Sequence, residues 1–225
     1  MNNFFKKKRK YLYLITPPEL LTKKLPLKNY LIVLNLVLKT KKIKFLQLRL
    51  KNKTKKKILY SLKKISVICK KNKTILFIND YIDNQFLKFC DGIHLGQKDI
   101  SKNKIKIILK KKKYLGITCH NTKLFAKQEI NFNPNYISFG SFFETKTKNV
   151  KHKADVKNIN WFKKNFKLPC AAIGGINLEN CNKILKTKCD LIAVSSGVWN
   201  YKNGPIEAVN KFYKILNNYN ENIFK

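Results

Sequence analysis

Short apolar runs rich in β-branched and aromatic residues alternate along the chain with longer stretches of helical periodicity. The short runs predict buried strands, whereas apolar positions spaced three and four apart predict helices. We expect strands over 11–16, 45–49, 75–79, 92–95, 114–119, 136–139, 170–173 and 191–195. The helices expected between and after them include 56–69, 101–109, 121–130, 161–166, 178–186 and 208–216.

The alternation of eight strands with helices predicts an α/β protein, a TIM (β/α)8 barrel with parallel strands. A doubly wound open sheet is the alternative, but that fold needs a glycine-rich turn after its first strand, where this chain has Thr16, Pro17 and Pro18. A length of 225 residues, 44% of them hydrophobic, suffices for one buried core. We expect a single TIM-barrel domain over 1–225, with a basic N-terminal extension over 1–10.

The charge balance is extreme, because 49 Lys and Arg residues stand against 12 Asp and Glu residues and give a formal net charge of +37. Such a charge suggests a nucleic-acid or membrane partner. The lysines, however, are spread over many short runs, and the aromatic residues fall inside the strand-like segments. A dedicated nucleic-acid surface would gather Arg and exposed aromatic residues in one region. We therefore expect weak, non-specific binding of polyanions at low salt and no specific nucleic-acid partner.

No segment of the sequence predicts export or membrane insertion. The most apolar stretch, 30–38, is too short to cross a bilayer and is interrupted by Asn35. The strand-like run 11–16, followed directly by two prolines, differs from the apolar core of a signal peptide. The six cysteines show no spacing suited to zinc or to a redox pair, so we expect them to be reduced. These features predict a cytoplasmic protein without a membrane partner.

Candidate chemistry gathers at the expected C-terminal ends of the strands, where TIM barrels carry their active sites. At the end of the second strand, the period of two turns Gln47, Arg49 and Lys51 to one face. Arg offers a fork for phosphate oxygens, Lys a mobile positive charge, and Gln an amide that can hold the edge of a heterocycle. Lys51 alone would equally fit a solvated barrel mouth, whereas the three together favour a site for a charged substrate.

Two carboxylates follow neighbouring strands. Asn79 and Asp80 end the third strand, and Asp99 follows the fourth. Magnesium prefers one or two carboxylates together with phosphate oxygens and water, so the pair predicts a magnesium site that serves a diphosphate. The alternative for each carboxylate is a helix N-cap. Because the chain has only 12 acidic residues, two of them at adjacent strand ends favour the metal.

The fifth strand ends with a hydroxyl and an imidazole, those of Thr118 and His120. His120 fits either an acid–base group or a hydrogen-bonded scaffold residue, and we expect His94 to form part of a pocket wall. The loop over 140–148, after the sixth strand, carries alternating hydroxyls followed by a lysine, which suits the binding of oxyanions by a mobile lid.

The turns after the seventh and eighth strands predict a phosphate site. Gly174 and Gly175 would let backbone amides approach a phosphate, and Ser195 and Ser196 form a small-residue turn beside them. A short helix starting near Ser196 would direct its N–H groups to the same place.

Taken in order, these motifs resemble those of the thiamine phosphate synthase family over nearly the whole chain. The matching motifs are Gln47-x-Arg49-x-Lys51, Asn79-Asp80, Gly96-Gln97-x-Asp99, Thr145-x-Thr147-Lys148, Gly174-Gly175 and Ser195-Ser196. Members of this family join a hydroxymethylpyrimidine diphosphate to a thiazole phosphate, which gives thiamine phosphate and pyrophosphate. The resemblance implies a transferase of thiamine biosynthesis that uses Mg²⁺ in a dissociative displacement.

The resemblance also implies roles for individual residues. Contact with the pyrimidine diphosphate is implied for Gln47, Leu48, Arg49, Leu50, Lys51, Asn79 and Thr118, and contact with magnesium for Asp80 and Asp99. Contact with the thiazole phosphate is implied for Thr145, Lys146, Thr147, Gly175, Ser195 and Ser196. The implied catalytic set is Arg49, Lys51, Lys148, which touches the diphosphate, and Thr118, which stands where the family usually has serine.

The chain departs from the family pattern in three places. Ser141 and Glu144 replace prolines that are usual in the loop after the sixth strand, and Ser195 replaces an aliphatic residue. The segment 188–191 lacks the glycines expected before the last strand. A looser sixth-strand loop would slow closure over the substrates without abolishing the chemistry.

Three alternatives stand beside the synthase hypothesis. A related thiazole tautomerase would share the barrel and the phosphate site but would need no metal site for a diphosphate, and Asp80 and Asp99 argue against it. A catalytically decayed barrel that binds polyanions would account for the charge. Another phosphate-handling barrel, as in tryptophan biosynthesis, conflicts with the Gln-x-Arg-x-Lys and Asn-Asp motifs. The oligomeric state stays open, with a homo-oligomer among the alternatives.

Overall fold

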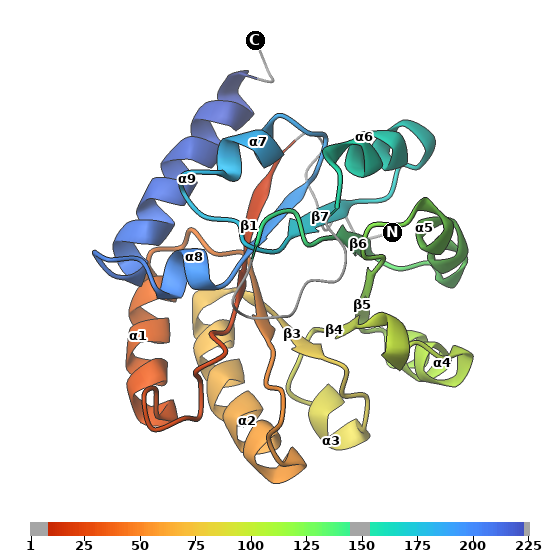
Figure 1. Ribbon diagram of the computed structural model, residues 1–225. Helices are drawn as coiled ribbons and strands as arrows, with labels where there is room; N and C mark the ends of the chain where they lie inside the picture. The colour runs from red at the N-terminus through yellow and green to blue at the C-terminus, as the bar shows by residue number, and fades with distance from the viewer. Residues whose placement is uncertain (1–8, 145–153, 223–225) are drawn as a thin grey trace.

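The computed structural model describes residues 9–144 and 154–222, and a closed barrel of parallel strands forms its centre (Figure 1). In chain order the strands are β1 Tyr11–Ile15, β2 Phe45–Leu48, β3 Ile75–Asn79, β4 Gly92–Leu95, β5 Tyr114–Thr118, β6 Tyr136–Phe139, β7 Cys170–Ile173 and β8 Leu191–Val194. Each strand pairs with the next, and β8 closes on β1 with Leu14 beside Val194. The predicted TIM barrel is confirmed, and no predicted strand is displaced by more than one residue at either end.

Helices surround the barrel and connect its strands on the outside (Figure 1). They are α1 Leu27–Lys39, α2 Lys55–Asn72, α3 Asn84–Leu87, α4 Lys102–Lys110, α5 Lys123–Glu129, α6 Val156–Asn165, α7 Cys181–Leu185, α8 Ser196–Trp199 and α9 Pro205–Asn222, with 3₁₀ turns η1 Gln97–Asp99 and η2 Ile130–Phe132. Four helices begin with a capping side chain whose oxygen accepts a backbone N–H of the first turn. The caps of α2, α4, α5 and α6 are Thr54, Ser101, Thr122 and Asp155.

Every predicted helix differs from its predicted bounds, with α9 longer at both ends, and at α6 and α7 local hydrogen bonds outweigh apolar periodicity. α6 begins five residues before the predicted 161, directly after the cap at Asp155. α7 covers only part of the predicted 178–186. The Asn177 side-chain oxygen accepts the backbone N–H groups of Glu179 at 3.0 Å and Asn180 at 2.9 Å, which holds the preceding segment in a turn.

The apolar core has two parts, one between strands and helices and a smaller one inside the barrel. Tyr13, Phe45, Phe77 and Tyr136 fill the barrel interior, and all four are almost completely buried. Gly116 makes room for this filling, since a Cβ at that position would lie 2.3 Å from the ring of Tyr136. The aromatic layer closes the barrel beneath the C-terminal ends of the strands, where the open volume lies.

Lys10 corrects the predicted N-terminal extension. This lysine is only 6% exposed, and its Nζ donates to the carbonyl oxygens of Thr187 at 2.6 Å and Cys189 at 2.7 Å. Its backbone N–H donates to the side-chain oxygen of Asn220 at 2.9 Å. The basic extension therefore ends before Lys10, because the carbonyl groups at the N-terminal end of the barrel hold this ammonium group in the fold.

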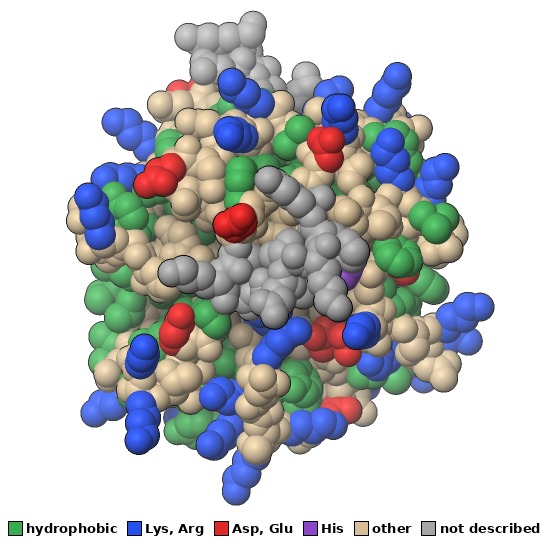
Figure 2. Space-filling model, in the orientation of Figure 1, with side chains coloured by type: hydrophobic (Ala, Val, Ile, Leu, Met, Phe, Trp, Pro, Cys, Tyr) green, Lys and Arg blue, Asp and Glu red, His purple; other side chains and the backbone are tan. Residues whose placement is uncertain are grey.

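The positive charge is spread over the surface of the protein. Lys and Arg side chains are scattered over the face seen in Figure 2, with fewer acidic side chains between them. All six cysteines are buried with free thiols, as predicted. Within residues 9–144 and 154–222, no helix has both the length and the apolar character that spanning a bilayer requires.

Candidate active site

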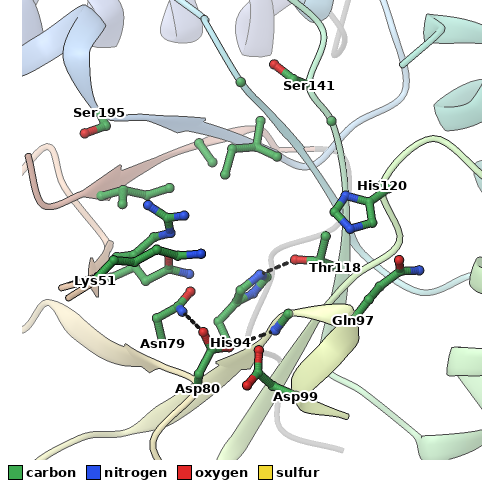
Figure 3. A pocket seen from close by; sticks show the side chains of 18 of the residues that line it. Lys51, Asn79, Asp80, His94, Gln97, Asp99, Thr118, His120, Ser141 and Ser195 are labelled. Atoms are coloured by element: carbon green, nitrogen blue, oxygen red, sulfur yellow. Dashed lines mark hydrogen bonds between the residues drawn. The ribbon is translucent and has the colours of Figure 1, made fainter. Parts of the chain in front are cut away.

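A cavity of about 890 Å³ opens at the C-terminal ends of the strands. Its wall includes most of the residues that the sequence singled out: Gln47, Arg49, Lys51, Asn79, Asp80, His94, Gly96, Asp99, Thr118, His120, Ser141, Gly174, Gly175, Ser195 and Ser196. In Figure 3 the carboxylates of Asp80 and Asp99 lie on one side of this cavity, and Ser141 and Ser195 lie on the opposite side. The barrel thus brings together residues that are far apart in the sequence.

The three polar residues from the end of β2 share the cavity, as their spacing predicted. The Thr16 hydroxyl donates to the carbonyl oxygen of Arg49 at 3.2 Å and accepts its backbone N–H at 3.0 Å, so β1 fixes the backbone of Arg49. Burial lowers the pKa of Arg49, and the charge of Asp80 acts in the opposite direction. A guanidinium group that is short of solvent and faces an open cavity is well suited to bind an anion.

Leu48 and Leu50 lie elsewhere. Their side chains are 1% and 6% exposed, pack in the core between strands and helices, and do not line the cavity. The alternation that directs Gln47 and Arg49 inward directs these leucines outward. The substrate contact that the resemblance implied for these two positions stays a prediction, and their outward side chains leave that contact to backbone atoms.

Asp80 and Asp99 approach each other around Gly96. A Cβ at Gly96 would lie 3.1 Å from Asp99 Oδ2 and 3.5 Å from Asp80 Oδ1, so both carboxylates border the same small space. Asp80 Oδ1 accepts the backbone N–H of Gly96 at 2.9 Å, and its other oxygen accepts the amide of Asn79. Burial raises the pKa of Asp80, the Gly96 N–H counteracts this, and the charge of Asp99 raises it further. Such mutual repulsion favours a cation between the two groups.

Neither carboxylate acts as the helix cap that the sequence allowed. The N-cap of α3 is Asp83, and the N-cap of α4 is Ser101, whose hydroxyl accepts the N–H of Lys104. Asp99 instead ends the short turn η1. With capping removed as an explanation, the two carboxylates remain as groups that face the cavity.

His94 forms the floor of the cavity and stays neutral. It is 5% exposed, with Nδ1 2.8 Å from the Tyr136 hydroxyl and Nε2 2.8 Å from the Thr118 hydroxyl. Burial, with a smaller contribution from the charge of Arg49, lowers the pKa of His94 to about 3. The prediction that His94 is part of the pocket wall is confirmed.

The lowered pKa of His94 predicts a stability that depends on pH. The unfolded chain takes up a proton near pH 6.5, whereas the folded chain does so only near pH 3, so stability falls as pH drops through this window. At pH 5 the loss from His94 is about 2 kcal/mol relative to pH 7.5. In His94→Gln this component of the free energy of unfolding should vanish, as measured by urea denaturation at both pH values.

The wild type and His94→Gln share the raised pKa values of Asp80 and Glu129. These two carboxyl groups change stability with pH in the direction opposite to His94, and their contribution cancels when the two proteins are compared. Parallel stability curves for the two proteins would show that His94 is not held neutral.

The opposite side of the cavity has the backbone shape expected of a phosphate site. Gly174 and Gly175 have φ values of 101° and 65°, a region that favours glycine. Helix α8 begins at Ser196, as predicted, and the Trp199 Nε1–H donates to the carbonyl oxygen of Ile15 at 2.7 Å, which fixes this helix to β1. The Ser195 hydroxyl donates to the carbonyl oxygen of Thr16 at 3.1 Å, so this substitute for an aliphatic residue has a structural partner.

The predicted lid is described only in part. Thr145, Lys146, Thr147 and Lys148 lie outside the described residues, so the positions implied for them stay predictions. Before them, the Ser141 hydroxyl donates to the carbonyl oxygen of Phe143 at 2.7 Å, and this bond shapes the loop where the family usually has proline. Glu144 is exposed.

Sequence reasoning missed several residues of the wall, namely Gln97, Asn121, Thr122 and Phe125. Gln97 stood inside a quoted motif without a role, and its Nε2 is buried without a hydrogen-bond partner in the described part of the chain. The other three follow β5. Asn121 and Thr122 lie just before α5 and Phe125 lies in its first turn, so no spacing along a strand marks them.

Comparisons with known proteins agree with this geometry. Residues 12–198 match a family model described as thiamine monophosphate synthase. A thiamine-phosphate synthase of Pelagibacter ubique is 44% identical over 206 residues, which cover 90% of this chain and 96% of that protein. The chain belongs to the thiamine monophosphate synthase family. It is therefore an enzyme, a transferase of the thiamine-phosphate synthase type.

Further relatives extend the agreement. A thiamine-phosphate synthase of Rhodospirillum centenum is 31% identical and covers 91% of this chain and 97% of its own length. The solved structure of a thiamine phosphate pyrophosphorylase from Pyrococcus furiosus superposes with a TM-score of 0.77 at 24% identity, covering 94% of this chain and 97% of its own. That structural likeness supports the barrel fold of the thiamine monophosphate synthase family.

Proposed function

We propose that this enzyme joins 4-amino-2-methyl-5-(diphosphooxymethyl)pyrimidine to a thiazole phosphate, forming thiamine phosphate and pyrophosphate. The observation that carries the proposal is the division of one cavity into two unlike sides. Asp80, Asp99, Arg49 and Lys51 suit a metal-bound diphosphate, while the glycine turn and Ser196 suit a second, singly phosphorylated substrate. Two substrates that each carry phosphate need such a pair of sites.

The side chains of this chain act mainly by alignment and charge. The bond between the pyrimidine methylene carbon and the diphosphate oxygen breaks, and its electron pair leaves with the diphosphate. The cations of Arg49 and Lys51 offset the negative charge that grows on the leaving group. The thiazole nitrogen then donates its lone pair to the methylene carbon, and the turn at Gly175 holds that substrate in line for the attack. No covalent enzyme intermediate is required.

Asp80 and Asp99 are the residues that would hold Mg²⁺. The small space that both carboxylates border around Gly96 fits a cation, and the raised pKa of Asp80 supports a site that gains from a positive charge. Among residues 9–144 and 154–222, no group of three or more His, Cys, Asp or Glu residues could hold a metal. Two carboxylates leave coordination positions for phosphate oxygens and water, as magnesium prefers. When bound, magnesium supplies charge neutralisation for the departing diphosphate.

The test is the formation of thiamine phosphate by the purified protein with both substrates, with Mg²⁺ and with a chelator. We expect product only with the metal. A thiazole tautomerase would instead convert its thiazole substrate without any pyrimidine diphosphate. A barrel that only binds polyanions would form no product and would bind DNA with a steep salt dependence. Each of these two outcomes contradicts the proposal.

A further inference from the structure

A chain of buried hydrogen bonds crosses the barrel beneath the cavity. The Gln47 Nε2 amide group donates to the Tyr13 hydroxyl at 3.2 Å, and the Tyr13 hydroxyl lies 2.9 Å from that of Tyr136. The chain continues through the imidazole of His94 to the Thr118 hydroxyl, with 2.8 Å on each side of the ring. It therefore links Gln47 on β2 to Thr118 on β5, and both ends face the cavity.

The donors in this chain can be placed by counting protons. Tyr13 already accepts an N–H from Gln47, so its own proton must go to Tyr136, the other partner of its hydroxyl. Tyr136 then donates to Nδ1 of His94. A neutral imidazole that accepts at Nδ1 carries its proton at Nε2, which donates to Thr118. If each bond between the side chains ran the other way, Tyr136 would donate to Tyr13. The buried Tyr13 hydroxyl would then face the Gln47 N–H with no acceptor for its own proton, which costs about 1–3 kcal/mol.

Two features support a neutral His94 inside this chain. Its ring nitrogens face hydroxyl groups rather than carboxylates, so an imidazolium would be buried without a counter-charge. Its lowered pKa agrees with this. The Thr118 hydroxyl oxygen accepts the Nε2 proton of His94 and keeps its own proton for the cavity, while the Ser138 hydroxyl lies 3.5 Å away.

We propose that Tyr13 and Tyr136 are positioning residues, which orient the Thr118 hydroxyl as a donor to the substrate and the Gln47 side-chain oxygen as an acceptor from it. This inference rests on the proposed function for the identity of that substrate. A 4-aminopyrimidine presents the complementary pair, an amine that donates and a ring nitrogen that accepts. The barrel core would thereby set the hydrogen-bonding pattern that the cavity offers.

The direction of the chain can be measured on the full-length protein without substrate, by nitrogen NMR of ¹⁵N-labelled histidine. The sequence has only three histidines, and His94→Gln identifies the signals of His94. We expect wild-type His94 to be the neutral tautomer with its proton on Nε2. In Tyr136→Phe, Nδ1 loses its hydrogen-bond donor, so the chemical shift of the unprotonated Nδ1 should change while Nε2 keeps its proton, because a proton on Nδ1 would be buried without an acceptor. A wild-type proton on Nδ1, or an unchanged Nδ1 shift in the variant, would overturn the proposal.

Kinetics supply the second readout. Tyr136→Phe should lower kcat/KM by about tenfold, with a raised KM for the pyrimidine diphosphate and an unchanged KM for the thiazole phosphate. Tyr30→Phe is the matched control, since it removes a buried hydroxyl that has no hydrogen-bond partner in the described residues. A changed Nδ1 signal with unchanged kcat/KM would refute the positioning role. If the wild type forms no thiamine phosphate, the proposed function fails, while the NMR result still decides the direction of the chain.

Discussion

Asp80→Asn is expected to lower kcat by at least about 100-fold, and Asp99→Asn by a similar factor. Each substitution keeps the size of the side chain but removes one of the two negative charges that border the space at Gly96. On the proposed function, the metal would bind more weakly and the departing diphosphate would lose its charge neutralisation. The measurement is the initial rate of thiamine phosphate formation over a range of Mg²⁺ concentrations.

Asp83→Asn is the matched control for both variants. Asp83 lies near Asp80 in the sequence but forms an exposed ion pair with Lys55 at 2.8 Å, outside the cavity. An exposed pair of this kind contributes little, so the rate should stay within about twofold of the wild type. If the Asp80 and Asp99 variants kept the wild-type rate at every Mg²⁺ concentration, the carboxylates would have no role in metal binding.

Gly175→Ala is expected to raise the KM for the thiazole phosphate and to lower kcat/KM by about 100-fold, because a displacement of about 1 Å at a reacting group has such an effect. The new Cβ would lie 2.3 Å from the backbone oxygen of Glu144 and 2.8 Å from the backbone of Phe143. Neither atom belongs to a flexible side chain, so the loop after β6 or the turn after β7 must move. Steady-state kinetics with each substrate varied in turn would measure the effect.

Gly204→Ala separates conformational strain from the clash. Gly204 also has a positive φ, 86°, but a Cβ there meets nothing within 4 Å, and the residue does not line the cavity. This variant should lose about 1–2 kcal/mol of the free energy of unfolding and keep its kinetic constants. Equal kinetic effects in the two variants would show that positive φ alone, and no substrate contact at Gly175, explains the loss.

Strand ends and their inward side chains were accessible to sequence reasoning because both follow short-range rules. The alternation along β2 sends Gln47 and Arg49 into the cavity and Leu48 into the outer core, whichever residues surround them. The same rule assigns an outward direction to the side chains of Leu48 and Leu50, so any contact that these two positions make with substrate is left to their backbone. The family resemblance implies substrate contact for a whole run of positions, whereas the alternation along a strand shows which side chains of that run face the cavity.

Specific hydrogen bonds account for the errors in the bounds of α6 and α7 and in the extent of the N-terminal extension. Asp155 and Asn177 fix the starts of α6 and α7 through side-chain oxygens that accept backbone N–H groups, which apolar periodicity does not register. Lys10 resembles the preceding lysines in the sequence, yet carbonyl oxygens of Thr187 and Cys189 hold it in the barrel. These oxygens are nearly 180 residues away along the chain, so no local pattern could have indicated them.

The sequence by itself determined the barrel, the order of its strands and the residue types at their C-terminal ends, because periodicity and turn chemistry act over a few neighbouring residues. Only the tertiary structure decided which of these groups meet. It placed Asp80 and Asp99 around Gly96, and it removed the helix-cap alternatives. It also joined Gln47 to Thr118 through two tyrosines and a histidine in the barrel interior. Such contacts depend on closure of the sheet, which brings distant strands within hydrogen-bonding distance.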